Sequence, residues 1–198
     1  YFNYTINQDL RDRKFQTQDG YQTFFSQEIP LISDNSEFSN AFEVSKFKKL
    51  STKSDTVGKI SFFAKTITGL SDDVRISKRL NIPTNKLRGF EKGRVGPIDN
   101  NDYVGGNHIT TLNLSATLPN ILEDLDNLDI GVFFDAANIW GVDYNSSLDD
   151  KSTIRTSTGI AFNLLTPIGP LSFSFANALT KASSDKTETF RFRLGTQF

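Results

Sequence analysis

The chain has 198 residues and a formal net charge of −1, so it lacks the overall basic character typical of nucleic-acid binding proteins. It contains no cysteine and one histidine, which excludes a disulfide framework and argues against a zinc site. No apolar run approaches the roughly 18 residues of a membrane helix. That excludes helical spans only, because the strands of a membrane β-barrel alternate lipid-facing and lumen-facing residues.

The first part of the chain alternates apolar and polar residues in the pattern of β-strands with one apolar face. The strands predicted from this alternation are residues 2–10, 21–32, 38–47 and 57–70. A short polar turn at residues 16–20 separates the first two of these strands, and another at residues 50–55 separates the last two.

The second part alternates more sharply and predicts five further strands. They cover residues 112–118, 128–140, 154–164, 171–179 and 190–198. A tight turn at residues 166–169 contrasts with a long connection at residues 141–152. Throughout, one face is apolar and aromatic, and the other is small, polar or charged.

About nine strands of roughly ten residues, without a convincing helix, predict an all-β fold. A soluble sandwich, with its apolar face buried and its polar face in water, fits the alternation equally well. Strand length and connection length favour an antiparallel up-and-down transmembrane β-barrel. In that arrangement the long connections at residues 71–104 and 141–152 lie on the same side, as in bacterial outer-membrane barrels.

Residues 71–104 have little hydrophobic periodicity, and a loop this long in a compact domain usually has a function or is disordered. Seven basic residues occur in it: Arg75, Lys78, Arg79, Lys86, Arg88, Lys92 and Arg94. At its centre lies the sequence Leu87-Arg88-Gly89-Phe90.

This loop sequence and four other segments, in order, resemble the bacterial surface antigen family of BamA-type outer-membrane assembly factors. Those other segments are residues 9–12 with the turn at 19–20, residues 133–140, residues 155–159 leading into 167–175, and the terminal strand ending in Phe198. The resemblance implies periplasmic POTRA domains followed by a sixteen-strand barrel. Because the chain opens mid-pattern without methionine, we expect it to be the C-terminal part of that barrel, with residues 71–104 as a long extracellular loop inserted into the lumen.

We infer that Arg88 pairs with Asp135 inside the barrel, because a guanidinium fork suits a carboxylate and Asp135 lies on the polar face of its strand. The resemblance supports this pairing. We further expect Phe90 to pack against Phe133 beside it. On alternation alone, a solvated loop arginine and a solvated strand aspartate are the simpler interpretation.

In the terminal strand we expect Phe190, Phe192 and Leu194 to face lipid and Phe198 to anchor at the interface. Gly195 is the natural position for a kink. The resemblance implies that this strand forms a weak lateral seam and an assembly signal, where a client strand can add by β-augmentation. An ordinary closing strand fits the same residues.

The function that the resemblance implies is the folding and insertion of β-barrel proteins into the bacterial outer membrane, without catalysis, cofactor or metal. The expected partners are outer-membrane lipid and lipopolysaccharide, client β-barrel proteins, and assembly lipoproteins bound through the POTRA domains, with no nucleic acid. The alternatives are a two-partner secretion transporter or TamA-like translocation pore, an outer-membrane enzyme or porin, and a soluble β-sandwich binding module. The sandwich requires the terminal phenylalanines to be buried by a second sheet.

Overall fold

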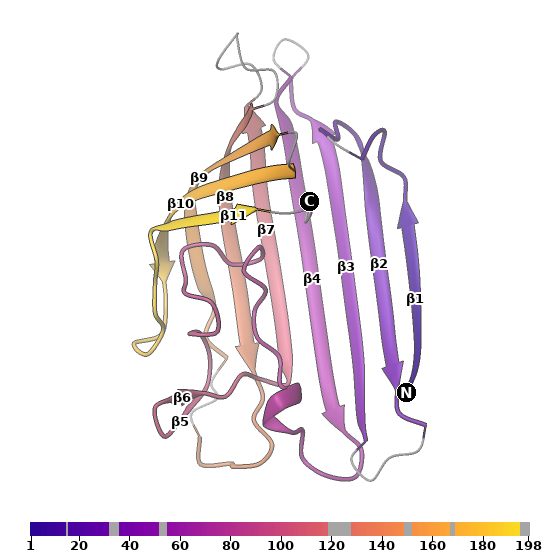
Figure 1. The fold of residues 1–198 in the computed structure, drawn as a ribbon, viewed down its shortest axis with the longest axis vertical. Coiled ribbons are helices and arrows are strands. Elements are labelled where there is room, and N and C mark those ends of the chain that lie inside the picture. Colours follow the sequence, from indigo (N-terminus) through magenta and orange to yellow (C-terminus); the bar gives the residue numbers. More distant parts are fainter. Residues whose placement is uncertain are drawn as a thin grey trace.

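The computed structural model describes residues 1–14, 16–31, 36–51, 55–118, 128–148, 152–166 and 169–194, apart from the side chains of Leu165 and Pro170. Nine strands form one antiparallel sheet in the order β1-β2-β3-β4-β7-β8-β9-β10-β11 (Figure 1). Their bounds are β1 Phe2–Asp9, β2 Gly20–Ile29, β3 Glu37–Lys49, β4 Val57–Gly69, β7 His108–Leu118, β8 Leu128–Trp140, β9 Arg155–Thr166, β10 Gly169–Thr180 and β11 Phe190–Leu194. Each strand pairs with the next strand of this sheet along the chain, which is the predicted up-and-down topology.

The long connection between β4 and β7 contains little regular structure. A single 3₁₀ turn covers Ile76–Lys78, and the two-residue strands β5, Ile98–Asp99, and β6, Asp102–Tyr103, pair as a small hairpin. No helix among the described residues is long and apolar enough to cross a membrane.

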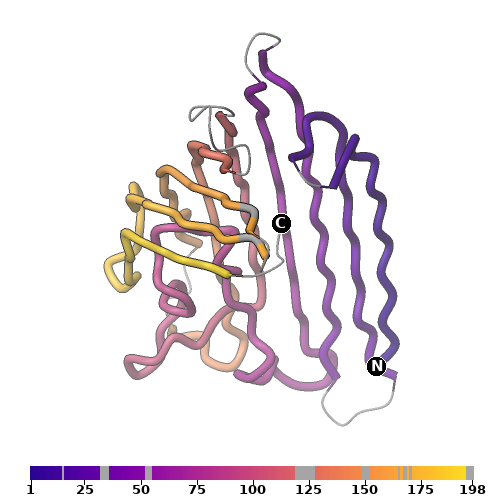
Figure 2. The backbone as a smooth tube through the Cα atoms, turned by 45° about the horizontal axis from the view of Figure 1, so that its top comes forward, coloured from indigo at the N-terminus to yellow at the C-terminus, as the bar shows by residue number. Residues whose placement is uncertain are grey.

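The sheet curves, so that β9, β10 and β11 cross in front of β7 and β8, and the long loop lies below these three strands in the view of Figure 1, in front of β7 and β8 (Figures 1 and 2). The loop therefore lies against the concave face. Buried apolar side chains from the loop and from this face form one core: Ile67, Val74, Leu80, Leu87, Phe90, Val95, Ile109, Ala137 and Ile139.

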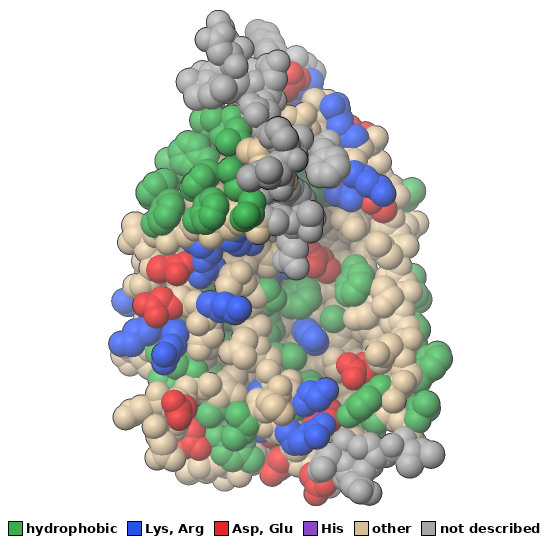
Figure 3. All heavy atoms as spheres, in the orientation of Figure 1, with side chains coloured by type: hydrophobic (Ala, Val, Ile, Leu, Met, Phe, Trp, Pro, Cys, Tyr) green, Lys and Arg blue, Asp and Glu red, His purple; other side chains and the backbone are tan. Residues whose placement is uncertain are grey.

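The convex face is apolar but exposed. Antiparallel register places Ile60 opposite Leu114, and Leu114 opposite Phe134, on that face. Phe175, Phe190 and Phe192 are each 50% exposed, and hydrophobic side chains gather over β9–β11 in Figure 3. These phenylalanines are not buried under a second sheet, so the soluble-sandwich alternative is wrong.

Several predicted strand ends differ from the structure. The second strand ends at Ile29 instead of residue 32, and β7 begins at His108 instead of residue 112. The sheet is open, because within the described residues β1 pairs only with β2, and β11 only with β10.

Candidate functional site: a loop held against the concave face

The centre of the site is Asp135 of β8, whose side chain is completely buried. It accepts hydrogen bonds from three groups of Arg88: the backbone N–H at 3.1 Å, Nε at 2.8 Å and Nη2 at 2.7 Å. Asn113, opposite Asp135 on β7, donates a fourth from Nδ2 at 2.8 Å. The structure therefore brings together the loop arginine and the strand aspartate that the sequence analysis paired.

The ring of Phe133 packs against the guanidinium of Arg88. The guanidinium carbon of Arg88 lies 3.4 Å from the centroid of the Phe133 ring, which adds a cation–π contact to the ion pair. Gly159 of β9 is directly opposite Phe133, and a Cβ there would come within 2.8 Å of the ring. The absence of a side chain at Gly159 makes room for the ring.

The expected contact between Phe90 and Phe133 is replaced by two separate ones. The Arg88 guanidinium covers the ring of Phe133, whereas Phe90 is buried in the apolar core that includes Leu87 and Val95. The buried cluster that contains Phe90 does not include Phe133.

Gly89 allows the loop backbone to approach the sheet closely. Its φ is +86°, a left-handed conformation that favours glycine. An added Cβ would lie 3.2 Å from the Cβ of Ala176 and 3.3 Å from that of Ser157, which are small residues of β10 and β9. The loop motif therefore rests directly on two strands near the C-terminal edge of the sheet.

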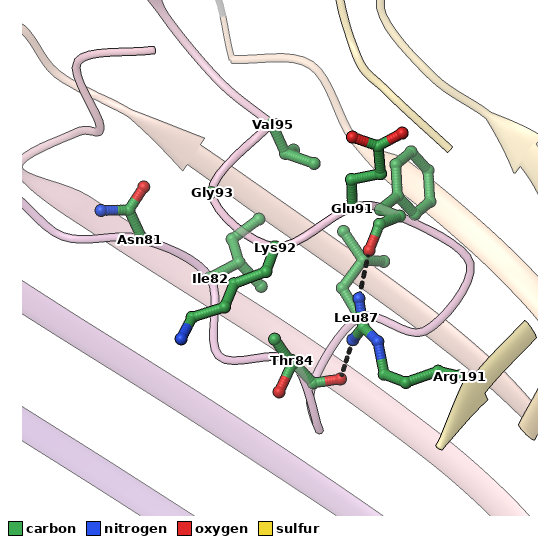
Figure 4. Close-up of a pocket in the computed structure, with 10 residues that line it drawn as sticks. Asn81, Ile82, Thr84, Leu87, Glu91, Lys92, Gly93, Val95 and Arg191 are labelled. Atoms are coloured by element: carbon green, nitrogen blue, oxygen red, sulfur yellow. Dashed lines mark hydrogen bonds between the residues drawn. The ribbon is translucent and has the colours of Figure 1, made fainter. Parts of the chain in front are cut away.

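The terminal strand also holds the loop. Arg191 of β11 donates from Nη1 to the carbonyl of Thr84 at 2.7 Å and from Nη2 to the carbonyl of Phe90 at 2.5 Å (Figure 4). Just before β11, Glu188 N–H donates to the Gly89 carbonyl at 3.1 Å and the Lys186 carbonyl accepts from Glu91 N–H at 3.0 Å. The loop and the segment entering β11 therefore pair like two short strands.

A second buried ion pair connects β9 to the β10–β11 connection. Arg155 donates to Asp185 from Nε at 2.9 Å and from Nη2 at 3.2 Å, and both side chains are almost fully buried. Asp185 also accepts from the backbone N–H of Ala182 at 2.7 Å and of Gly96 at 3.3 Å. This carboxylate therefore also fixes the far part of the long loop.

A third ion pair lies where the loop leaves β4 and returns to β7. Arg79, whose side chain is fully buried, pairs with Asp143, which also accepts from Val74 N–H and from Asn107. Burial alone would raise the pKa of Asp143, but these hydrogen bonds outweigh it and hold that pKa below its usual range. The guanidinium of Arg79 lies over the Tyr144 ring at 4.8 Å.

The sequence profile of the Omp85 superfamily domain matches residues 1–198, which is the whole chain. The chain belongs to the Omp85 superfamily. It is 31% identical over 139 residues to the outer membrane protein assembly factor BamA of Neisseria meningitidis serogroup B, covering 57% of this chain and 17% of that protein. It is also 27% identical over 117 residues to BamA of Neorickettsia risticii, covering 58% and 16% respectively.

A crystal structure of Haemophilus ducreyi BamA lacking POTRA domains 1–3 has the same fold, with a TM-score of 0.85 and 24% identity. It matches 96% of this chain, and the match covers 41% of that chain. The chain thus spans less than half of each of these relatives. As an Omp85 domain it is an outer-membrane protein of a Gram-negative bacterium, and its nine strands correspond to part of the BamA barrel.

The terminal strand of this Omp85 domain faces outward as expected. Phe190, Phe192 and Leu194 are at least half exposed, and Phe192 lies 5.2 Å from Phe173, centroid to centroid, on the neighbouring strand. Gly195 and Phe198 lie outside the described residues.

Sequence reasoning missed the roles of Arg191, Arg155 and Arg79. Arg191 and Arg155 alternate with apolar residues in their strands, which indicates the polar face but gives no partner for either. Among the described residues no group of three or more His, Cys, Asp or Glu side chains is arranged to hold a metal ion.

Proposed function

We propose that this chain is the C-terminal part of the barrel of an outer-membrane assembly factor, which folds and inserts β-barrel proteins by strand addition at a lateral seam. The observation that carries the proposal is the edge of β11. This five-residue strand pairs only with β10 among the described residues, so its other edge has backbone donors and acceptors for a further strand. The names of the two curated relatives support the same activity.

The held loop gives this seam a rigid support. Arg191 links β11 to the loop, and Arg88 links the loop to β8 through Asp135. Strand addition at β11 therefore occurs beside a loop that is fixed at both sides. The free energy comes from the client's own folding, so the mechanism needs no catalytic residue and no cofactor.

The partners in this proposal are client β-barrel proteins at the seam and outer-membrane lipid with lipopolysaccharide around the convex face. Accessory assembly lipoproteins would bind through POTRA domains in the full-length protein. A secretion pore of the same superfamily is the second candidate, because it would use the same loop and a similar barrel.

Disulfide trapping during assembly tests the proposal. Residues 1–198 contain no cysteine, so Phe192→Cys in a full-length protein cleared of any cysteine elsewhere provides a single thiol, on β11. Thr66→Cys on β4, a strand paired on both sides, is the control. We expect a client with a cysteine in an edge strand to cross-link to position 192 and not to position 66.

Insertion of the client without any cross-link to the terminal strand would contradict strand addition at β11. Release of the client on the outer side of the membrane, instead of its insertion, would favour the secretion pore.

A further inference from the structure

The outward-facing residues of the sheet are almost free of charge. The pairing register of the nine strands shows which residues lie on the convex face. They run from Tyr4 opposite Gln27 at one edge of the sheet to Phe175 opposite Phe190 at the other. Among the described, paired positions of this face, charge occurs only at Lys46 and Lys48, which are both on β3 and both exposed.

Neither lysine has a carboxylate partner among the described residues. Lys46 is opposite Tyr21 on one side and Ile60 on the other, and Lys48 is opposite Gly58. The neighbouring Lys49 points to the other face and pairs with Asp55 at 2.5 Å. Two like charges are therefore held on one face, two residues apart, without a counter-ion in the part of the chain that the structure describes.

Their depth is that of a membrane interface. Phe42, next to the middle of the thirteen-residue β3, faces the same side. Lys46 and Lys48 lie about 13 and 20 Å further along the strand. A strand tilt of about 40° reduces these lengths to heights of about 10 and 15 Å, on either side of the edge of an apolar band about 25 Å tall. A cation costs roughly 2–4 kcal/mol at the bilayer midplane but about 0–1 near the interface, so this depth tolerates both lysines.

Tyr21 marks the same level. It is 38% exposed beside Lys46, and tyrosine is enriched in the aromatic girdles of outer-membrane barrels. The connection from β3 to β4 at this end, residues 50–56, is short, whereas the long loop leaves β4 at the opposite end. Short turns face the periplasm, so the two lysines lie at the periplasmic leaflet.

We propose that Lys46 and Lys48, with Tyr21 beside them, bind the phosphate group of anionic glycerophospholipids in the periplasmic leaflet of the outer membrane. Val44 precedes Lys46 on the same face and Ile60 is opposite it, so the aliphatic stem of this lysine can follow the apolar face while its ammonium group reaches the phosphates. The site fixes the vertical position of β3, and it is independent of strand addition at β11.

Native mass spectrometry of the full-length protein in detergent tests this site. The lipids are phosphatidylglycerol, phosphatidylcholine and lipid A of matched chain length. The test variant is Lys46→Gln with Lys48→Gln. One control is Lys46→Arg with Lys48→Arg, which keeps the charge, and the other is Lys65→Gln, which removes a lysine from the concave face of β4.

We expect the ratio of phosphatidylglycerol binding to phosphatidylcholine binding to be about ten- to thirtyfold lower in the double glutamine variant than in the wild type. The arginine variant and Lys65→Gln should keep that preference. The proposal is overturned if the glutamine variant keeps the preference, if Lys65→Gln loses it equally, or if lipid A binding falls while phosphatidylglycerol binding does not. The last result would assign the lysines to the lipopolysaccharide leaflet.

Discussion

Asp135 concentrates four hydrogen bonds on one buried carboxylate, and three of them come from Arg88. Hydrogen bonds to a charged group contribute more than neutral ones, and bidentate geometry adds directional specificity. Since Asp135 is fully buried, it would be an unfavourable residue without this partner. The pair therefore fixes the loop in one position.

Asp135→Asn is predicted to release the loop. The substitution leaves the guanidinium of Arg88 without its counter-ion in a mostly buried site, which costs about 3–5 kcal/mol when one partner of a buried pair is removed. Hydrogen exchange of the full-length protein should show loss of protection at residues 86–90. Glu91→Gln, which changes an exposed carboxylate in the same loop, should leave that protection intact. Equal protection in the wild type and Asp135→Asn would show that the pair does not hold the loop.

Asp143 makes the stability of the loop dependent on pH where the loop leaves β4 and returns to β7. Its pKa is depressed in the folded state, so its contribution is complete above the unfolded pKa of about 3.9 and is lost as the pH falls through the folded pKa. Exchange at residues 74–80, corrected for the intrinsic rate, should therefore rise on acidification below about pH 4. Asp143→Asn should remove this dependence, and a dependence that persists in that variant must arise from another group.

The strands were predictable where outward apolar residues alternate with inward polar ones, as in the centre of β7 and β8. The alternation failed at the loop end of β7, where His108 and Thr110 face outward and Ile109 packs inward against the loop core. The pattern inverts there because the loop, not lipid, supplies the apolar contact. The beginning of this strand was therefore missed.

For the buried arginines, the ion-pair partner was less predictable than the face of the sheet on which a strand arginine lies. Arg88 was assigned to Asp135 with the help of the motif. Arg155 and Asp185 are separated by 30 positions and Arg79 and Asp143 by 64, so neither pair has a local spacing signal. Alternation indicates on which face a strand residue lies, but the fold of the loop decides which carboxylate it meets.

Arg191→Met is predicted to uncouple the loop from β11. Two hydrogen bonds from a charged donor are lost, each contributing about 1.5–3 kcal/mol, so exchange at residues 84–91 should increase by about tenfold or more. Arg193→Met is the matched control, because Arg193 lies on the same face two residues later and makes no hydrogen bond to the described residues. If both variants behave alike, the effect belongs to the charge of the strand and not to the contacts of Arg191.

As a whole, the described part of the molecule is a curved sheet with an apolar convex face, a loop packed against its concave face and two open edges. This arrangement differs from a soluble domain, because the buried core forms between loop and sheet instead of between two sheets. The exposed convex face meets lipid, as the outer-membrane location of the Omp85 superfamily requires. Its open edges carry backbone donors and acceptors with which, in the proposed function, a client strand pairs.

Client insertion by four forms of the full-length protein tests most directly whether, in the proposed function, assembly needs a loop fixed by Arg88 and Asp135. The forms are the wild type, Arg88→Met, Asp135→Asn and the double variant, assayed in phospholipid vesicles, with loop exchange measured on the same samples. We expect each single variant to free the loop and slow insertion by about tenfold or more, and the double variant to be no slower than the slower single one, because the two residues act as a unit. Single variants that free the loop and still insert clients at the wild-type rate would contradict the requirement for a fixed loop.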